Sequence, residues 1–189
     1  MSFLVLLLPE IQTYILQNMG MDVNKLALQK NPFPDIDFKI ILNQIETRIK
    51  SKDKLPTWFN AQDIIFPSKI SIEQTSSEVT AQYKLQLISG TNLIDLTGGF
   101  GVDDYYFSKK VKQVVHCEIN EELSEIVQHN FRQLNCTNIK CFSGDSSDFL
   151  TQSTTKYDWI YIDPSRRRRF AWRNRKSDRG ARRAAHADA

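Results

Sequence analysis

The alternation of strand-like and helix-like segments between residues 91 and 165 constrains the fold more than any other feature. Four short apolar runs at 92–96, 111–119, 137–144 and 157–163 have the length and composition of strands. Segments with apolar residues at helical spacing separate them at 101–110, 121–135 and 146–152. This β-α-β-α-β-α-β order with short connections predicts an α/β fold with a parallel sheet of about four strands and right-handed crossovers.

A helical region is predicted before the sheet. Residues 1–56 contain two segments in which apolar side chains recur at helical spacing, around Ile11–Met19 and Ile36–Ile49. Residues 57–90 read as a linker containing Pro67, followed by one helix over 71–89 that Gly90 ends. The expected organisation is therefore a helical region at 1–56, a linker and helix at 57–90, and the α/β domain at 91–165.

The charge of the chain is unevenly distributed. Residues 166–189 hold nine Arg and one Lys against two Asp, which leaves 15 basic and 20 acidic residues in the first 165. Only Arg48 and Arg132 occur in that first part, where all other basic residues are lysines. A basic arm that binds nucleic acid has this composition, and so has a non-native extension. We expect the segment to be disordered or foreign to the fold.

The cysteines and the apolar N-terminus limit the compartment. Cys117, Cys136 and Cys141 form neither a disulfide framework nor a CxxC metal pair, so we expect free thiols, no metal and a cytoplasmic protein. The apolar run at 3–8 is too short to span a membrane and lacks the features of a signal peptide. We expect it to form the buried face of an N-terminal helix.

An acidic residue follows each predicted strand. In a doubly wound sheet, ligands bind outside the carboxyl ends of the strands. One such acid is readily explained as a helix cap, but four in corresponding positions indicate a binding cleft. The four are Asp95, Glu118, Asp145 and Asp163.

The loop after the first strand discriminates between ligands. Thr97-Gly98-Gly99-Phe100-Gly101 is followed by Val102-Asp103-Asp104, which lacks the Lys-Ser/Thr of a nucleoside-triphosphate loop. The glycine spacing departs from that of a dinucleotide site, and two aspartates would repel a pyrophosphate. Glu118 lies 23 residues after Asp95, close to the spacing of a ribose-binding acid. S-adenosylmethionine, an adenosyl cofactor without phosphates, fits this pattern better.

These residues also carry a family resemblance. "DLTGGFG" resembles motif I of class I S-adenosylmethionine-dependent methyltransferases, with Thr97 where many members have Gly, and "CEIN", "GDSSDF" and "IDPSRR" resemble the next three motifs. With "LPTW" and "EQTSSEVTAQYK" upstream, the ordered set resembles a bacterial methyltransferase family associated with THUMP-like domains. The likeness covers about 55–167 and is loose before that. Since this Rossmann-like sheet normally has seven strands, we expect a C-terminally truncated chain with little or no activity.

The resemblance implies roles for individual residues. The glycines of the loop, with Thr97, would approach the methionine moiety, and Asp95 would hold the loop or accept from the ammonium. Glu118 would bind the ribose, Ile119 would lie against the adenine, and Asp145 would accept from the adenine amino group. Ser146 would also bind the cofactor. The helix carrying Thr80 and Lys84 would cover the cofactor. Beside the transferring methyl, as catalytic residues, would lie Asp163 and Pro164.

The resemblance also implies the reaction. It implies methyl transfer to RNA. A base amine is one candidate target, because "DPSR" begins like the Asp-Pro-Pro-aromatic motif of base-amine methyltransferases, but the aromatic residue that would stack on the base is missing. Two other functions stay open at this point. One is an RNA-binding module that acts through the Arg-rich tail, and the other, disfavoured by the glycine spacing, is an NAD-dependent oxidoreductase. The sequence indicates neither the methylated atom nor the oligomeric state.

Overall fold

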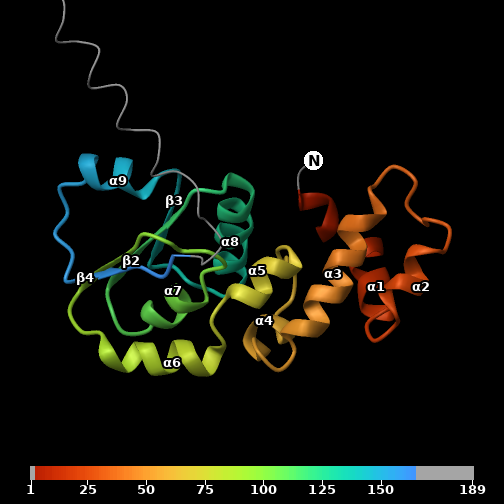
Figure 1. Cartoon of the computed structure of the whole chain (residues 1–189), viewed down its shortest axis with the longest axis horizontal. Coiled ribbons are helices and arrows are strands. Elements are labelled where there is room, and N and C mark those ends of the chain that lie inside the picture. Colours follow the sequence, from red (N-terminus) through yellow and green to blue (C-terminus); the bar gives the residue numbers. More distant parts are fainter. Residues whose placement is uncertain (1–2, 165–189) are drawn as a thin grey trace, which may run out of the picture.

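The structure is a computed structural model that describes residues 3–164. A helical part formed by residues 3–60 lies beside an α/β part formed by the described residues that follow (Figure 1). The predictions for the Arg-rich segment 166–189 fall outside the described residues.

The sheet has four parallel strands in the order β3-β2-β1-β4. They are β1 (Asn92–Asp95), β2 (Gln113–Glu118), β3 (Ile139–Ser143) and β4 (Trp159–Tyr161). In the register, Asp95 lies beside His116 of β2 and Tyr161 of β4. The strand order reverses between β1 and β4, which makes their carboxyl ends the switch point of the sheet. The predicted Rossmann-like α/β fold is confirmed.

Three helices connect the strands and cover both faces of the sheet. They are α7 (Val102–Phe107), α8 (Glu121–Gln133) and α9 (Ser146–Gln152). Phe107 of α7 packs with Leu93 and Val114 on one face. Phe149 of α9 packs against Ile94 and neighbouring residues on the opposite face. Because helices cover both faces of the sheet, residues on both sides of β1 and β2 are buried, which explains why these strands are nearly continuous apolar runs.

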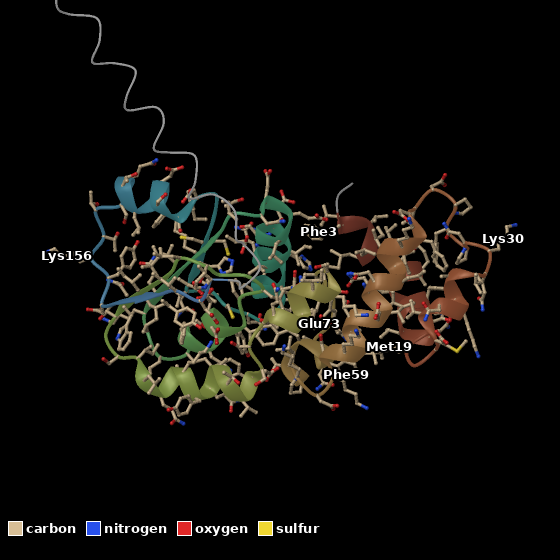
Figure 2. All side chains as sticks on the ribbon, viewed as in Figure 1. Phe3, Met19, Lys30, Phe59, Glu73 and Lys156 are labelled. Carbon is tan, nitrogen blue, oxygen red and sulfur yellow. The ribbon has the colours of Figure 1, made fainter. Side chains whose placement is uncertain are left out.

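The helical part contains a short 3-10 helix η1 (Phe3–Leu7) and four α-helices. These are α1 (Pro9–Gln17), α2 (Val23–Ala27), α3 (Phe38–Ser51) and α4 (Pro56–Asn60). In the apolar run, Leu6 is buried but Leu4 and Leu8 are exposed, so it forms only part of a buried face. Phe3 lies toward α8 (Figure 2), with its ring centroid 5.7 Å from that of His129.

An extended segment fastens the helical part to the α/β part. Ile65 donates its N–H to the side-chain oxygen of Asn130 on α8 and accepts from the Asn130 amide, at 3.0 and 2.8 Å. Phe66 makes the same reciprocal pair with Gln44 on α3, at 2.9 and 2.6 Å. All four bonds are buried, and one apolar core continues from Ile41 of α3 to the residues of α8. The two parts therefore pack as one unit.

The single helix predicted over 71–89 is two helices. They are α5 (Lys69–Gln74) and α6 (Glu78–Leu87). Thr75 is extended, with ψ 155°, and the Ser77 hydroxyl caps α6 by accepting from the N–H of Thr80 at 3.1 Å. Serine and threonine side chains compete for backbone donors, which favours helix ends over helix interiors. The Thr-Ser-Ser run therefore breaks the helix although the apolar spacing continues through it.

Candidate functional site

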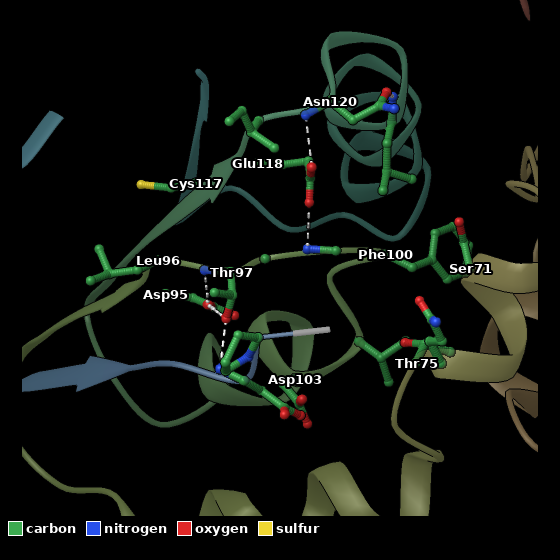
Figure 3. A pocket seen from close by; sticks show the side chains of 18 of the residues that line it. Ser71, Thr75, Asp95, Leu96, Thr97, Phe100, Asp103, Cys117, Glu118 and Asn120 are labelled. Atoms are coloured by element: carbon green, nitrogen blue, oxygen red, sulfur yellow. Dashed lines mark hydrogen bonds between the residues drawn. The ribbon is translucent and has the colours of Figure 1, made fainter. Parts of the chain in front are cut away.

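A cleft of about 950 Å³ lies at the carboxyl ends of the strands, at the switch point between β1 and β4. One wall consists of the loops after the strands, and the other consists of α5 and the residues that follow it (Figure 3). Ten of the thirteen predicted site residues line it. They are Asp95, Thr97, Gly98, Gly99, Glu118, Ile119, Asp145, Ser146, Asp163 and Pro164.

Gly98 and Gly99 are glycines for different structural reasons. Gly98 donates its N–H to the carbonyl of Cys117 at 2.9 Å, and a Cβ built on it would lie 2.2 Å from the His116 ring. Gly99 has φ +56°, and a Cβ there would meet nothing closer than 3.8 Å. Gly98 therefore lets the loop pack on β2, while Gly99 leaves an open, left-handed backbone facing the cleft.

Glu118 connects the two loops after β1 and β2. Its Oε2 accepts from the N–H of Gly99 at 3.0 Å, and its Oε1 accepts from the N–H of Asn120 at 2.7 Å (Figure 3). The carboxylate is thereby fixed in orientation, while each oxygen retains the capacity to accept a further hydrogen bond. A vicinal diol is one ligand that can use both oxygens.

Asp95 and Thr97 form a chain of hydrogen bonds to the loop after β4. Asp95 Oδ1 accepts from the N–H of Thr97 at 2.7 Å and from its hydroxyl at 3.2 Å. The Thr97 hydroxyl in turn accepts from the N–H of Asp163 at 2.7 Å (Figure 3). Burial, with the nearby charge of Asp104, holds the pKa of Asp95 well above its usual value. This geometry favours Asp95 as the residue that holds the loop.

The two adjacent aspartates of α7 point in different directions. Asp104 is fully buried, and its Oδ2 lies 2.5 Å from Nδ1 of the equally buried His116. Burial raises the pKa of Asp104 and lowers that of His116, since both charged forms lose hydration. Only Asp103 lines the cleft. The expectation that both aspartates would repel a ligand phosphate is therefore wrong for Asp104, which faces the core.

Asp103 belongs to a polar cluster beside the cleft that the sequence does not reveal. Its Oδ2 accepts from the Lys84 ammonium at 2.8 Å, from the Ser76 hydroxyl at 2.9 Å and from the Tyr161 hydroxyl at 3.1 Å. Lys84 also donates to Tyr161 and Ser76, and its Nζ lies 3.8 Å from Asp163 Oδ2. Burial and the neighbouring acids raise the pKa of Tyr161 far above its usual value.

The structure does not place three predicted residues on the lining of the cleft. Thr80 is exposed on α6, and its hydroxyl lies 2.9 Å from that of Ser77 at the helix start. Gly101 has φ +76° at the start of α7, and a Cβ there would lie 2.5 Å from Phe131, so the glycine serves packing against α8. Lys84 reaches the cleft only through the residues that it binds.

The helical wall contributes six lining residues that the sequence did not predict. They are Ile70, Ser71, Glu73, Gln74, Thr75 and Ser76. The only sequence signal for them is the Thr-Ser-Ser run, which predicts a helix break but no ligand. Beyond them, the lining includes Asp103 and Tyr161, and the signal for Tyr161 is its position at the end of β4.

Asp145 in the loop after β3 and Ile119 in the loop after β2 complete the strand-end wall. Asp145 caps α9, with Oδ1 accepting from the N–H and the hydroxyl of Ser147 at 2.9 and 2.6 Å. Ile119 is half exposed at the cleft.

Within residues 3–164 no group of three or more His, Cys, Asp or Glu side chains is placed to hold a metal ion. None of the helices in that range is long and apolar enough to cross a membrane.

Known proteins with similar sequences carry methyltransferase names. The chain is 26% identical over 158 residues to an uncharacterized RNA methyltransferase of Mycoplasma mobile, covering 76% of this chain and 44% of that protein. It is 32% identical over 79 residues to an uncharacterized RNA methyltransferase of Clostridium acetobutylicum, covering 42% of this chain and 17% of that one. The chain thus spans less than half the length of these relatives.

A solved structure shares most of the fold. The crystal structure of a Porphyromonas gingivalis W83 protein assigned as a methyltransferase superposes with a TM-score of 0.74 at 30% sequence identity, covering 89% of this chain and 42% of that one. A family model described as conserved hypothetical protein 95 matches residues 59–171, more than half of the sequence. The chain belongs to this conserved hypothetical protein 95 family.

Proposed function

We propose that the chain is the cofactor-binding part of an S-adenosylmethionine-dependent methyltransferase that acts on RNA. The observation that carries the proposal is the convergence of four strand-end acids and an open glycine loop on one cleft at the switch point of the sheet. The methyltransferase names of the similar proteins support the reaction class, and the RNA methyltransferase names support the substrate class.

The residues of the cleft fit a cationic adenosyl ligand without phosphates. Asp103, Glu118 and Asp163 bring carboxylates to the lining, and no Lys or Arg lines it in the described part of the chain. Such a lining disfavours phosphate groups and favours a positive charge. The volume is in the range of cavities that hold cofactor-sized molecules. Nucleoside triphosphates and dinucleotides fit it less well.

The protein would act by holding and aligning its ligands. When bound, S-adenosylmethionine supplies a methyl group activated by the adjacent sulfonium. Glu118, oriented by two backbone N–H groups, would accept from the ribose hydroxyls, and Ile119 would pack against the adenine. Asp163, whose backbone N–H is tethered to Thr97, would position the acceptor beside the methyl group with Pro164. Correct alignment is the main contribution that a protein makes to such a displacement.

Calorimetric titration with S-adenosylhomocysteine tests the cofactor assignment. We expect binding by the wild-type chain, with NAD and ATP giving none at the same concentrations. Glu118→Ala should weaken binding at least tenfold, because it removes the acceptor and frees the Gly99 loop. Glu125→Ala is the matched control, since Glu125 is exposed on α8 and outside the cleft. Equal binding by both variants, or preferred binding of NAD, would contradict the assignment.

Transfer of a labelled methyl group tests the substrate class. After incubation with methyl-labelled S-adenosylmethionine and total bacterial RNA, we expect any label that is transferred to be released by ribonuclease and not by protease. Label that stays with protein would contradict RNA as the substrate. Digestion to nucleosides would then show whether the label is on a base amine.

The RNA-binding alternative rests on the nine arginines of 166–189. It predicts RNA binding that weakens steeply with salt, is lost on deletion of that segment and does not depend on the cofactor. RNA binding that survives the deletion would instead favour a role for the cleft.

A further inference from the structure

Lys84 is a cation bonded directly to residues that line the cleft beside the end of β4. Its Nζ contacts residues from four other segments. They are Ser76 after α5, Asp103 of α7, Tyr161 of β4 and Asp163 after β4, at 2.9, 2.8, 2.5 and 3.8 Å. Its side chain is 22% exposed, and that of Asp103 is 13% exposed. This geometry differs from that of a solvated surface lysine.

The cluster has an unequal number of positive and negative groups. Asp103 and Asp163 contribute two carboxylates, and Lys84 contributes one ammonium. Burial and the neighbouring acids raise the pKa of Tyr161, so its phenol stays neutral and adds no charge. The side of the cleft next to the loop after β4 therefore carries one net negative charge. Without Lys84 it would carry two.

We propose that Lys84 is a positioning residue that sets this charge at minus one, and thereby sets how strongly the protein prefers a cationic ligand over its neutral counterpart. The inference rests on the proposed function, because S-adenosylmethionine and S-adenosylhomocysteine differ by one methyl group and one positive charge at sulfur. A site with excess negative charge would favour the cation further. Lys84 thus limits the discrimination between cofactor and product while it fixes the side chains of Asp103 and Tyr161.

The ratio of two dissociation constants tests the inference. For each variant of the full chain, binding of S-adenosylmethionine and S-adenosylhomocysteine is measured by calorimetry at pH 8 and low salt. In Lys84→Met, we expect the preference for S-adenosylmethionine to rise roughly three- to tenfold, as an extra unit charge near the sulfonium predicts. Asp103→Asn should shift the preference in the opposite direction by a similar factor. Structural damage would lower both affinities and would not produce opposite signs.

Two control variants separate charge from structure. Lys84→Arg keeps the charge and should keep the wild-type ratio. Lys110→Met removes a lysine that also holds α6, through the carbonyls of Leu85 and Gln86 at 3.2 and 3.3 Å, but lies outside the cleft, and it too should keep the ratio.

The outcomes distinguish the inference from the proposed function. Opposite shifts in Lys84→Met and Asp103→Asn, with unchanged controls, support it. If the wild type binds both ligands and the ratio does not change in either variant, the inference is wrong and the proposed function stands. A shift of the same size in Lys110→Met also overturns the inference. If the wild type binds neither ligand, the proposed function fails and the inference falls with it.

Discussion

The two walls of the cleft are built in different ways. The strand-end wall is held by bonds between residues close to the sheet, such as Gly98 to Cys117 and Gly99 to Glu118, and it packs on the buried His116. The helical wall is held by individual side chains from outside the sheet, such as Lys54, whose Nζ donates to the carbonyls of Ile72 and Glu73 at 2.8 and 3.1 Å. Order in the first wall follows from the fold, whereas order in the second depends on individual side chains.

The largest effect is expected at the strand-end wall, in Gly98→Ala. The added methyl would lie 2.2 Å from the His116 ring, which is fully buried and cannot move away. Overpacking against such a group costs about 3 kcal/mol or more, and we expect the free energy of unfolding in urea to fall by that amount.

Gly99→Ala is the matched control for that prediction. Its methyl would have space, so only the left-handed backbone costs free energy, about 1 kcal/mol. If the two variants lost equal stability, the contrast between a packing glycine and a loop-facing glycine would be refuted.

The next effect tests how the extended segment that leads into α5 is held against α8, through Asn130→Ala. Asn130 on α8 satisfies both backbone groups of Ile65, and all of these atoms are buried. We expect a loss of about 2–3 kcal/mol in urea denaturation, because the amide and carbonyl of Ile65 lose their partners. Asn135→Ala is the surface comparison, because Asn135 is exposed just after the end of α8 and lies outside the Asn130–Ile65 pair. Its φ of +56° predicts a small loss of stability of its own. A loss in Asn130→Ala no larger than in Asn135→Ala would show that the Asn130–Ile65 pair contributes little.

Sequence patterns predict the strand-end wall well for a physical reason. The acids after the strands and the loop glycines are placed by strand ends, and strand ends are visible as apolar runs. Asp103 and Asp104 show the limit of this reasoning, because adjacent residues at a helix start point in different directions and only the fold decides which one is buried. Lys84 and Thr80 show another limit, since a predicted covering helix does not tell which of its faces meets the cleft.

The sequence did not predict the helical wall, because the side chains of this region contact residues of the sheet to which no local pattern links them. Lys84 of α6 donates both to Ser76 and to Tyr161 of β4, and no local pattern encodes its meeting with the strand. The break between α5 and α6 had a local signal in Thr75-Ser76-Ser77, but the helical spacing on both sides outweighed it. Capping chemistry was the correct guide there.

A smaller effect, on pH dependence, is expected for Asp95→Asn in the strand-end wall. The pKa of Asp95 is raised in the folded state, so its contribution to stability is complete below about pH 3.8 and is lost as pH rises through the raised pKa. His116 acts in the opposite sense, since its lowered pKa means that stability is lost as pH falls below 6.5. Asparagine removes only the first of these contributions.

We therefore expect Asp95→Asn to lose less stability than the wild type between pH 4 and pH 8, by on the order of 1 kcal/mol. Urea unfolding at several pH values measures the difference. Since an asparagine Oδ1 can still accept from Thr97, the loop should keep its conformation. An unchanged slope with pH would mean that burial does not raise the pKa of Asp95 in the folded protein.

The smallest effect concerns the break in the helical wall, through Ser77→Ala. The Ser77 hydroxyl accepts from the N–H of Thr80 at 3.1 Å and caps α6. Its loss should cost about 1 kcal/mol in urea denaturation. Thr80→Ala is the matched control, because it removes the hydroxyl that contacts Ser77 and keeps the backbone cap, so we expect about half that loss or less. If Thr80→Ala were the more damaging, the hydroxyl pair rather than the cap would hold the start of α6. The start of α6, which is the part of the helical wall that a local sequence signal indicates, would then also depend on a contact between side chains.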